Sequence, residues 1–320
     1  MEINTMKTNR RNFLKTAGLG IAGLNLTGLI SENLFAANGP GVAGVGMCDW
    51  NLGKTASPEA VPKAKKAGLQ GIQVSVGTDP RNIPLRDQSV RRKYLELGKQ
   101  YGIRFHSVAA GGILNKIPLA TEPQSAVYVI DAVEAAAALG AKNILIAFFG
   151  NGDLRLRNSE GKFRDVKDGR FSSYELNSKH VKRVVEALRQ IVPRAEDAGV
   201  ALGIENTITA KQNLEIIDQI GSEMVQVYYD VGNSWGNGYD VPAELRMLAK
   251  NRICEVHLKD WKTPLLGSAE GMVDMGRCAK ALADIGYDKW LVLETSGRKG
   301  KFFEDTRANV AFVKKTFRMG

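Results

Sequence analysis

From residue 41 onward, the chain alternates short runs of apolar residues with longer segments in which apolar residues recur at helical spacing. Short, nearly continuous apolar runs are typical of strands that are buried on both faces of a parallel sheet. The sequence predicts eight such strands, over 41–50, 70–76, 104–111, 143–150, 200–207, 225–232, 253–260 and 290–297. The longer segments predict amphipathic helices, the clearest of which cover 124–139, 173–198, 210–220 and 269–285.

Glycines mark the ends of several predicted helices, just before the next strand. A glycine at this point permits the left-handed backbone that turns the chain back into the sheet. The residues that fit this pattern are Gly68, Gly102, Gly140, Gly199 and Gly286. A strand followed by a helix, repeated eight times, predicts an α/β fold, a single-domain (β/α)8 TIM barrel over 38–320. The alternative, a doubly wound open sheet, would need a glycine-rich phosphate loop after the first strand, and CDWNLGKT at 48–55 is not one.

The first 37 residues have a different character from the rest of the chain. Paired arginines, Arg10 and Arg11, precede an apolar run rich in Gly, Ala and Leu, and this segment resembles a twin-arginine export signal. The alternative is a membrane anchor, for which an apolar run of about 18 residues interrupted by Asn25 is short. We therefore expect the mature protein to be periplasmic or otherwise exported, with the twin-arginine machinery as a partner and no membrane contact after signal removal.

Charge and cysteine content narrow the function classes. The net charge is +10, but its basic clusters, KAKK at 63–66 and RRK at 91–93, fall on predicted amphipathic helices. A solvated helix face explains them better than a nucleic-acid patch, so no nucleic-acid partner is expected. The three cysteines, Cys48, Cys254 and Cys278, contain no C-x-x-C pair and do not form a disulfide framework.

Polar residues stand at the ends of the last four predicted strands. In a TIM barrel, active-site groups lie at the carboxyl ends of the strands, where the strand–helix loops meet. Three carboxylates buried together repel one another, and a divalent cation removes that penalty. A mostly oxygen ligand set suits Mn²⁺, Mg²⁺ or Co²⁺, with Zn²⁺ as a further candidate. The candidate metal ligands are Glu205, Asp230, His257 and Glu294.

Each of these residues has an ordinary explanation when it is taken alone. Glu205 could be the partner in a salt bridge, and His257 could be a hydrogen-bonded histidine of the core. The convergence of all four on adjacent strands is what favours a metal site.

Five motifs in the last hundred residues carry a family resemblance. They are GIENT at 203–207, DVGN at 230–233, HLKD at 257–260, LGSAEGMVDM at 266–275 and LVLETSG at 291–297. The chain resembles the xylose isomerase-like TIM barrel superfamily, in its sugar phosphate isomerase/epimerase branch. This resemblance implies that Glu205, Asp230, His257 and Glu294 hold one divalent metal ion. The chain departs from the pattern at Asn233, where many members have a histidine.

The resemblance implies proton transfer next to the carbonyl of a small sugar. A bound metal would stabilise an enediolate, with Glu205 and Glu294 as the catalytic residues that remove and return the proton. Because phosphorylated sugars are mainly cytoplasmic, we expect an isomerase or epimerase of an unphosphorylated sugar or keto-sugar. The same proton abstraction would also serve a lyase of 3-keto-glycosides.

Two other functions are less well supported than a sugar isomerase or epimerase. A non-catalytic sugar-binding protein would require a decayed site, but all four ligand candidates are present. An endonuclease IV-type repair enzyme needs more histidines than the three of this chain. The oligomeric state stays open, with a homo-oligomer among the alternatives.

Several other residues are candidates for substrate binding. Lys259 could donate a hydrogen bond to a substrate oxygen or form an ion pair with Asp260 or Glu294. The remaining candidates at the predicted strand ends are Asn233, His106, Trp50 and Trp261, and Phe149, for which core packing is favoured.

A polar insertion at 151–173 follows the fourth predicted strand. It is too long for a tight connection, and it is either a lid over the site or a disordered surface loop. As a lid it would bring Arg155, Arg157 or Arg164 near the ligand.

Overall fold

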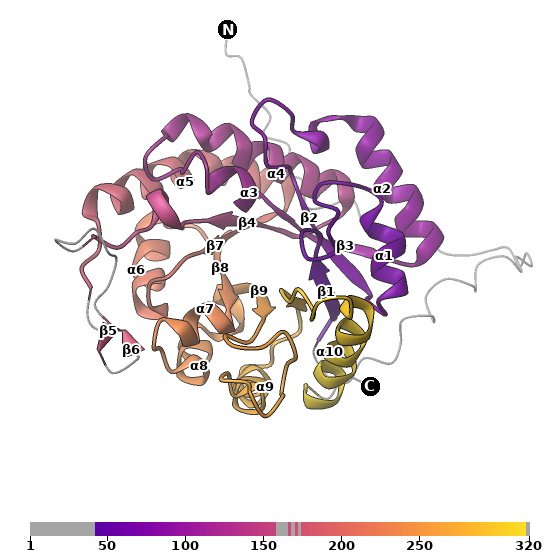
Figure 1. The fold of residues 1–320 in the computed structure, drawn as a ribbon. Coiled ribbons are helices and arrows are strands. Elements are labelled where there is room, and N and C mark those ends of the chain that lie inside the picture. The colour runs from indigo at the N-terminus through magenta and orange to yellow at the C-terminus, as the bar shows by residue number, and fades with distance from the viewer. Residues whose placement is uncertain (1–41, 158–165, 168–169, 172–173, 318–320) are drawn as a thin grey trace, which may run out of the picture. The chain divides into compact units, whose positions relative to one another are not determined.

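Within the described residues, eight parallel strands close into a barrel in the computed structural model, as Figure 1 shows. The structure describes residues 42–157, 166–167, 170–171 and 174–317. Around the barrel, each strand pairs with its neighbours in the order β1-β10-β9-β8-β7-β4-β3-β2. The strands are β1 (Gly44–Cys48), β2 (Gly71–Ser75), β3 (Arg104–Ala109), β4 (Asn143–Ala147), β7 (Ala201–Glu205), β8 (Val225–Asp230), β9 (Ile253–Leu258) and β10 (Trp290–Leu293). This closed barrel confirms the predicted (β/α)8 fold.

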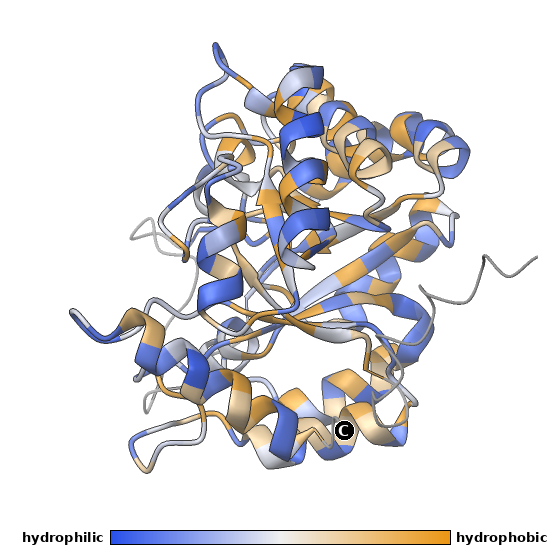
Figure 2. Ribbon diagram, turned by 90° about the vertical axis from the view of Figure 1, so that its right-hand side faces the viewer, coloured by the Kyte–Doolittle hydropathy of each residue, from blue (hydrophilic) through white to orange (hydrophobic). Residues whose placement is uncertain are grey.

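Helices form a layer outside the strands. They are α1 (Ala60–Lys66), α2 (Gln88–Tyr101), α4 (Ala126–Leu139), α5 (Ser178–Ala198), α6 (Ala210–Ile220), α8 (Val241–Arg252), α9 (Met275–Asp284) and α10 (Phe302–Thr316). Shorter elements are α3 (Gly111–Leu114), α7 (Val231–Gly236), and the 3-10 turns η1 (Pro84–Arg86), η2 (Pro123–Ser125) and η3 (Gly150–Gly152). In Figure 2 the helices alternate apolar and polar bands, as expected for helices with one face on the barrel. No helix among the described residues combines the length and apolarity needed to cross a membrane.

Two predicted helices begin later than the sequence pattern suggested. The segment predicted over 173–198 becomes helical at Ser178, because the Asn177 side chain accepts a hydrogen bond from the His180 amide and caps the helix. The segment predicted over 269–285 becomes helical at Met275, where Asp274 is the cap. The glycine stops behave as predicted, since Gly102, Gly140 and Gly199 all take the left-handed conformation that ends the preceding helix.

The inside of the barrel is filled by apolar and aromatic side chains together with a polar group of residues. The apolar cluster consists of Cys48, Ala109, Leu145, Ala147, Ala201, Tyr228, Cys254 and Val292. Glycines in the first strand make room for larger neighbours, since a Cβ atom on Gly46 would lie 2.2 Å from Nε2 of His106. The much larger apolar core lies between the strands and the helices.

The insertion after β4 contains a short antiparallel pair, β5 (Val166–Lys167) and β6 (Arg170–Phe171). Arg155 is buried, and its guanidinium binds Asp153 (Nη2 to Oδ2, 2.7 Å) and Asn237 (Nη1 to Oδ1, 2.9 Å). It therefore anchors the start of the insertion to the end of α7. Arg164, like the predicted signal at 1–37, lies outside the described residues.

Candidate metal centre

Four residues from consecutive barrel strands converge at one rim. Glu205 and Asp230 are the last residues of β7 and β8, His257 is the penultimate residue of β9, and Glu294 directly follows β10. The register explains the meeting, because Asp230 pairs with His257 across β8 and β9, and His257 pairs with Val292 of β10. One ligand atom from each of the four residues lies within 4.8 Å of the others. The structure thus brings together all four candidate ligands that the sequence proposed.

The spacing of these atoms fits a shared ion. Nδ1 of His257 lies 3.5 Å from Oε1 of Glu205, 3.8 Å from Oδ2 of Asp230 and 3.6 Å from Oε2 of Glu294. Ligand atoms at about 2.1 Å from one ion in tetrahedral geometry are about 3.4 Å apart. Nδ1 of His257 is buried and makes no hydrogen bond to any described residue. A buried, unpaired nitrogen that faces three carboxylates is well suited to bind a cation.

The other nitrogen of His257 is held by residues that the sequence analysis missed. Nε2 lies 3.0 Å from Oε1 of Gln73 on β2. Because a carbonyl oxygen only accepts, this contact requires a hydrogen on Nε2 and leaves Nδ1 as the nitrogen that can bind a cation between the carboxylates. The thiol of Cys48 on β1 also donates to Oε1 of Gln73, at 3.3 Å. A glutamine and a cysteine inside otherwise apolar strands were the only sequence signal for this contact.

Replacement of Gln73 by leucine should therefore weaken metal binding. Leucine has a similar volume but cannot fix the tautomer of His257, and loss of such a partner lowers metal affinity by about 10–100-fold. Competition with a fluorescent chelator measures this affinity. Gln73→Glu retains an acceptor and should keep an affinity near that of the unaltered protein. Equal affinities for all three proteins would show that Gln73 does not position His257.

Lys259 lies among the same carboxylates. Its Nζ atom is 2.9 Å from Oδ2 of Asp230 and 2.7 Å from Oε2 of Glu294. Of the ion pairs considered from the sequence, the one with Glu294 is therefore formed. Asp260 instead accepts hydrogen bonds from the amides of Lys262, Met272 and Val273 and holds the loop that follows β9.

The charges of this group shift one another. Burial raises the pKa of Asp230 above its ordinary value. Burial also opposes the charge on Glu294, but His257 and Lys259 outweigh it and lower the pKa of that carboxyl. For Lys259, the neighbouring carboxylates overcome burial and raise the pKa of the ammonium. The group thus favours bound positive charge at neutral pH.

The aromatic and amide candidates lie at different distances from the cluster. The Trp50 ring is 6.2 Å from the His257 ring in an edge-on arrangement, so Trp50 adjoins the centre. Asn233 lies in the first turn of α7, where its backbone N–H donates to Oδ1 of Asp230 at 2.7 Å. Phe149 packs, partly buried, against the cluster inside the barrel. Trp261 is 51% exposed beside Trp235, beyond the end of β9.

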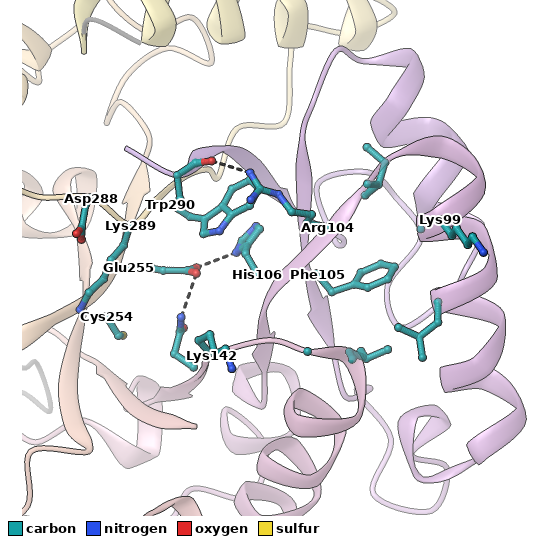
Figure 3. Close-up of a pocket in the computed structure, with 17 residues that line it drawn as sticks. Lys99, Arg104, Phe105, His106, Lys142, Cys254, Glu255, Asp288, Lys289 and Trp290 are labelled. Atoms are coloured by element: carbon teal, nitrogen blue, oxygen red, sulfur yellow. Dashed lines mark hydrogen bonds and ion pairs between the residues drawn. The ribbon is translucent and has the colours of Figure 1, made fainter. Parts of the chain in front are cut away.

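His106 is not part of this rim, which corrects its predicted position. The strand begins at Arg104, so His106 is its third residue and not near its end. Its ring stacks on Trp290 at 4.7 Å, and Nδ1 lies 2.9 Å from Oε2 of Glu255. Figure 3 shows these residues lining a cavity of about 570 Å³ among the first residues of the strands. This placement gives no support to a substrate-binding role for His106.

Glu255 is the second buried group that the sequence analysis missed. Besides His106, it accepts hydrogen bonds from Tyr228 (Oη to Oε2, 2.6 Å) and Asn143 (Nδ2 to Oε1, 3.0 Å). The Tyr228 ring in turn packs against the His257 ring at a centroid distance of 4.5 Å. Glu255 therefore organises the barrel interior beneath the candidate metal centre.

Comparisons with known proteins agree with this architecture. The chain is 24% identical over 238 residues to 2-epi-5-epi-valiolone 7-phosphate 2-epimerase of Actinoplanes sp., covering 72% of this chain and 78% of that protein. The apo structure of 3-keto-D-glucoside 4-epimerase YcjR from E. coli is similar with a TM-score of 0.67 and 16% identity, over 85% of this chain and 98% of that one.

A third similar structure is that of the IolI protein with a bound zinc atom. Its TM-score is 0.60 at 15% identity, over 85% of this chain and 96% of that one. At these identities the two structures support the fold. The family model of the xylose isomerase-like TIM barrel matches residues 61–316. The chain therefore belongs to the xylose isomerase-like TIM barrel family.

Proposed function

We propose that the protein is a divalent-metal-dependent epimerase or isomerase of an unphosphorylated sugar or keto-sugar, in the sugar phosphate isomerase/epimerase branch of its family. The observation that carries this proposal is the convergence of Glu205, Asp230, His257 and Glu294 within 4.8 Å at the carboxyl rim of the barrel. The epimerase names of the Actinoplanes relative and of YcjR support the reaction class. The zinc atom of IolI supports a divalent ion.

The four residues would hold the ion, which would supply Lewis-acid stabilisation of the negative charge that develops on the substrate oxygens. Strands β7 and β10 flank the β8–β9 pair, so Glu205 and Glu294 approach the cluster from opposite sides. Each carboxylate has a second oxygen that can face a substrate carbon. One residue would remove the proton, and the other would return it on the opposite face or at the adjacent carbon.

Asp230 is a poor candidate for proton transfer. Its Oδ1 atom caps α7 by accepting a hydrogen bond from the backbone N–H of Asn233, and its Oδ2 atom forms an ion pair with Lys259. Both oxygens are thereby held in place, which suits a ligand better than a base.

The charges near the rim favour an uncharged substrate. Lys259 is bound by two carboxylates, and the guanidinium of Arg155 is bound by Asp153. Asp153 also accepts from Thr207, just beyond Glu205, so this ion pair lies on the same side of the barrel. Cations that are already neutralised bind a phosphate group weakly.

The experiment that tests the function is metal removal. Purified protein should contain about one divalent ion per chain, and a chelator should lower the rate of proton exchange at a substrate carbon by at least about 100-fold. A panel of free ketohexoses and 3-keto-glucosides in D₂O, read by mass spectrometry, measures that rate. Added Mn²⁺, Mg²⁺, Co²⁺ or Zn²⁺ should restore it. Full exchange without metal, or no exchange in metal-loaded protein, would contradict the proposal.

A second candidate reaction is elimination from a 3-keto-glycoside, favoured by the similarity to a 3-keto-D-glucoside epimerase. It begins with the same proton abstraction and ends with loss of the group on the next carbon. Release of the aglycone from a 3-keto-glucoside, together with deuterium uptake, distinguishes it from epimerisation.

We further propose that residues 1–37 direct export to the periplasm through the twin-arginine machinery. The Arg10-Arg11 pair and the following apolar run support this proposal. Replacement of both arginines by lysine should leave the uncleaved protein in the cytoplasmic fraction, whereas replacement of Lys15 by arginine should not. Export of the doubly altered protein would contradict it.

A further inference from the structure

A second cavity, of about 720 Å³, lies at the end of α7 and the beginnings of α8 and α9. Its walls include Trp235, Tyr239, Trp261, Met272, Asp274 and Arg277. The side chains of Trp261 and Met272 are 51% and 45% exposed, and the indole rings of Trp235 and Trp261 lie 6.4 Å apart. Exposed apolar surface that lines a hollow marks a binding site more often than chance exposure does.

Helix α7 leads from the metal centre to this cavity. Its amino end is capped by Asp230, one of the four candidate ligands. Gly232 packs against Lys259, because a Cβ atom added to Gly232 would lie 2.5 Å from Cγ of Lys259. Gly236 packs against Trp261, because a Cβ atom added to Gly236 would lie 2.4 Å from the indole ring. Four residues of helix rise about 6 Å. The Trp261 indole is therefore displaced along α7 from Lys259 by roughly the width of one sugar ring. Lys259 in turn contacts two of the candidate metal ligands, Asp230 and Glu294.

The far wall of the cavity is fixed before any ligand binds. Asp260 accepts hydrogen bonds from the amides of Met272 and Val273 and thereby holds the loop that carries Met272. The carboxylates of Asp240 and Asp274 cap α8 and α9 through the amides of Ala243 and Arg277. A binding surface held in this way loses little conformational entropy when it is occupied.

The chemistry of the walls suits a neutral ring with hydroxyl groups. Indole faces pack against the C–H face of a pyranose, while carboxylate and guanidinium groups hydrogen-bond to hydroxyls. Nη2 of Arg277 lies 3.8 Å from Oδ1 of Asp240, so this cation has a carboxylate beside it. Two carboxylates and one guanidinium at the rim disfavour a phosphate or sugar acid.

We propose that this cavity is a subsite for a second, uncharged sugar ring, so that the substrate is a glycoside whose first ring occupies the metal centre. The position of the first ring rests on the proposed function, whereas binding of the second ring depends on the aromatic cavity alone. The proposal narrows the substrate class from free sugars to glycosides.

Calorimetric titration of the metal-loaded protein with glucose, cellobiose and maltose tests the subsite. At least one disaccharide should bind about tenfold or more tightly than glucose. Trp261→Ala should reduce this ratio to about twofold or less, and Trp261→Phe, which keeps an aromatic face, should retain most of it. Met247→Ala removes an equally exposed apolar side chain on α8 outside the cavity and should not alter the ratio.

The outcomes separate the two proposals. A disaccharide preference that depends on Trp261, with no proton exchange on any sugar, would overturn the enzymatic function and keep the subsite. No preference for disaccharides, or a preference that survives both Trp261→Ala and Trp235→Ala, would overturn the subsite. Sedimentation of the same proteins gives a third outcome. If Trp261→Ala converts a dimer into a monomer without changing sugar binding, the cavity is an interface between copies, and the subsite is excluded.

Discussion

Replacement of Glu205 or Glu294 by glutamine should lower deuterium exchange at the substrate carbon by about 10³-fold in metal-saturated protein. Glutamine keeps the size of the side chain and one oxygen for the ion, but its amide cannot accept the proton, and loss of a general base costs about 10²–10⁴-fold. Oε1 of Glu205, at the end of β7, lies 3.5 Å from Nδ1 of His257. Oε2 of Glu294, just after β10, lies 3.6 Å from the same atom. Mass spectrometry of sugar incubated in D₂O measures the exchange.

Differences between the two variants would report on the direction of the reaction. If the residues work on opposite faces of the substrate, one variant should lose exchange from one epimer and the other variant from its counterpart. The control is Glu270→Gln, an exposed glutamate in the segment after β9, which should exchange at the unaltered rate. Metal content must be measured for each protein, because a variant that has lost its ion reports on binding only. Exchange at the unaltered rate by both metal-loaded variants would remove Glu205 and Glu294 from the mechanism.

The candidate ligands could be found from the sequence because their positions depend on local order in the chain. Each lies within two residues of the end of its strand, and parallel strands in a closed barrel end at a common rim. A boundary error of one or two residues does not change this conclusion. The fold was predictable because it depends on the alternation of strands and helices along the chain. It does not depend on whether any single side chain points into or out of the barrel.

Residues inside the barrel were not predictable, because two bulges disturb the alternation of inward and outward side chains. Between β2 and β3, Ile72 pairs with Phe105 but Gln73 pairs with Ser107, so His106 is an extra residue. Between β8 and β9, the pairing passes from Ile253 to Glu255 and skips Cys254. A bulge places two successive residues opposite one partner and re-aims the side chains. The inward positions of His106 and Glu255 therefore depend on strand pairing, which a single sequence does not reveal.

The buried carboxylate of Glu255 should contribute strongly to the stability of the barrel. Glu255→Gln should lower the free energy of unfolding by about 3–5 kcal/mol, because it breaks the buried carboxylate–histidine contact and leaves buried hydrogen-bond donors without an acceptor. The carboxylate accepts hydrogen bonds from His106, Tyr228 and Asn143, and it is 1% exposed. An amide at this position would turn an N–H group toward at least one of these donors. Urea unfolding followed by circular dichroism measures the change.

The control is a glutamate-to-glutamine change at the surface. Glu186 is 53% exposed, and its Oε1 atom lies 3.9 Å from Nζ of Lys182. An exposed pair of this kind contributes less than about 1 kcal/mol, so Glu186→Gln should unfold nearly as the unaltered protein does. Equal unfolding free energies for Glu255→Gln and Glu186→Gln would show that the interior charge is not important for stability.

The pH dependence of unfolding tests the same residue in a different way. Burial opposes the charge on Glu255, but His106 and the donated hydrogen bonds outweigh it and lower the pKa of this carboxyl in the folded protein. A group whose pKa is lower in the folded state adds stability above its unfolded pKa, about 4.3 for glutamate, and loses it as the pH falls through the folded value. The unaltered protein should therefore lose more stability than Glu255→Gln between pH 5 and pH 3, taken as a rough window from those pKa values. Parallel stability curves for the two proteins would mean that the pKa of Glu255 is the same in the folded and unfolded states, which would contradict its lowering by the barrel interior.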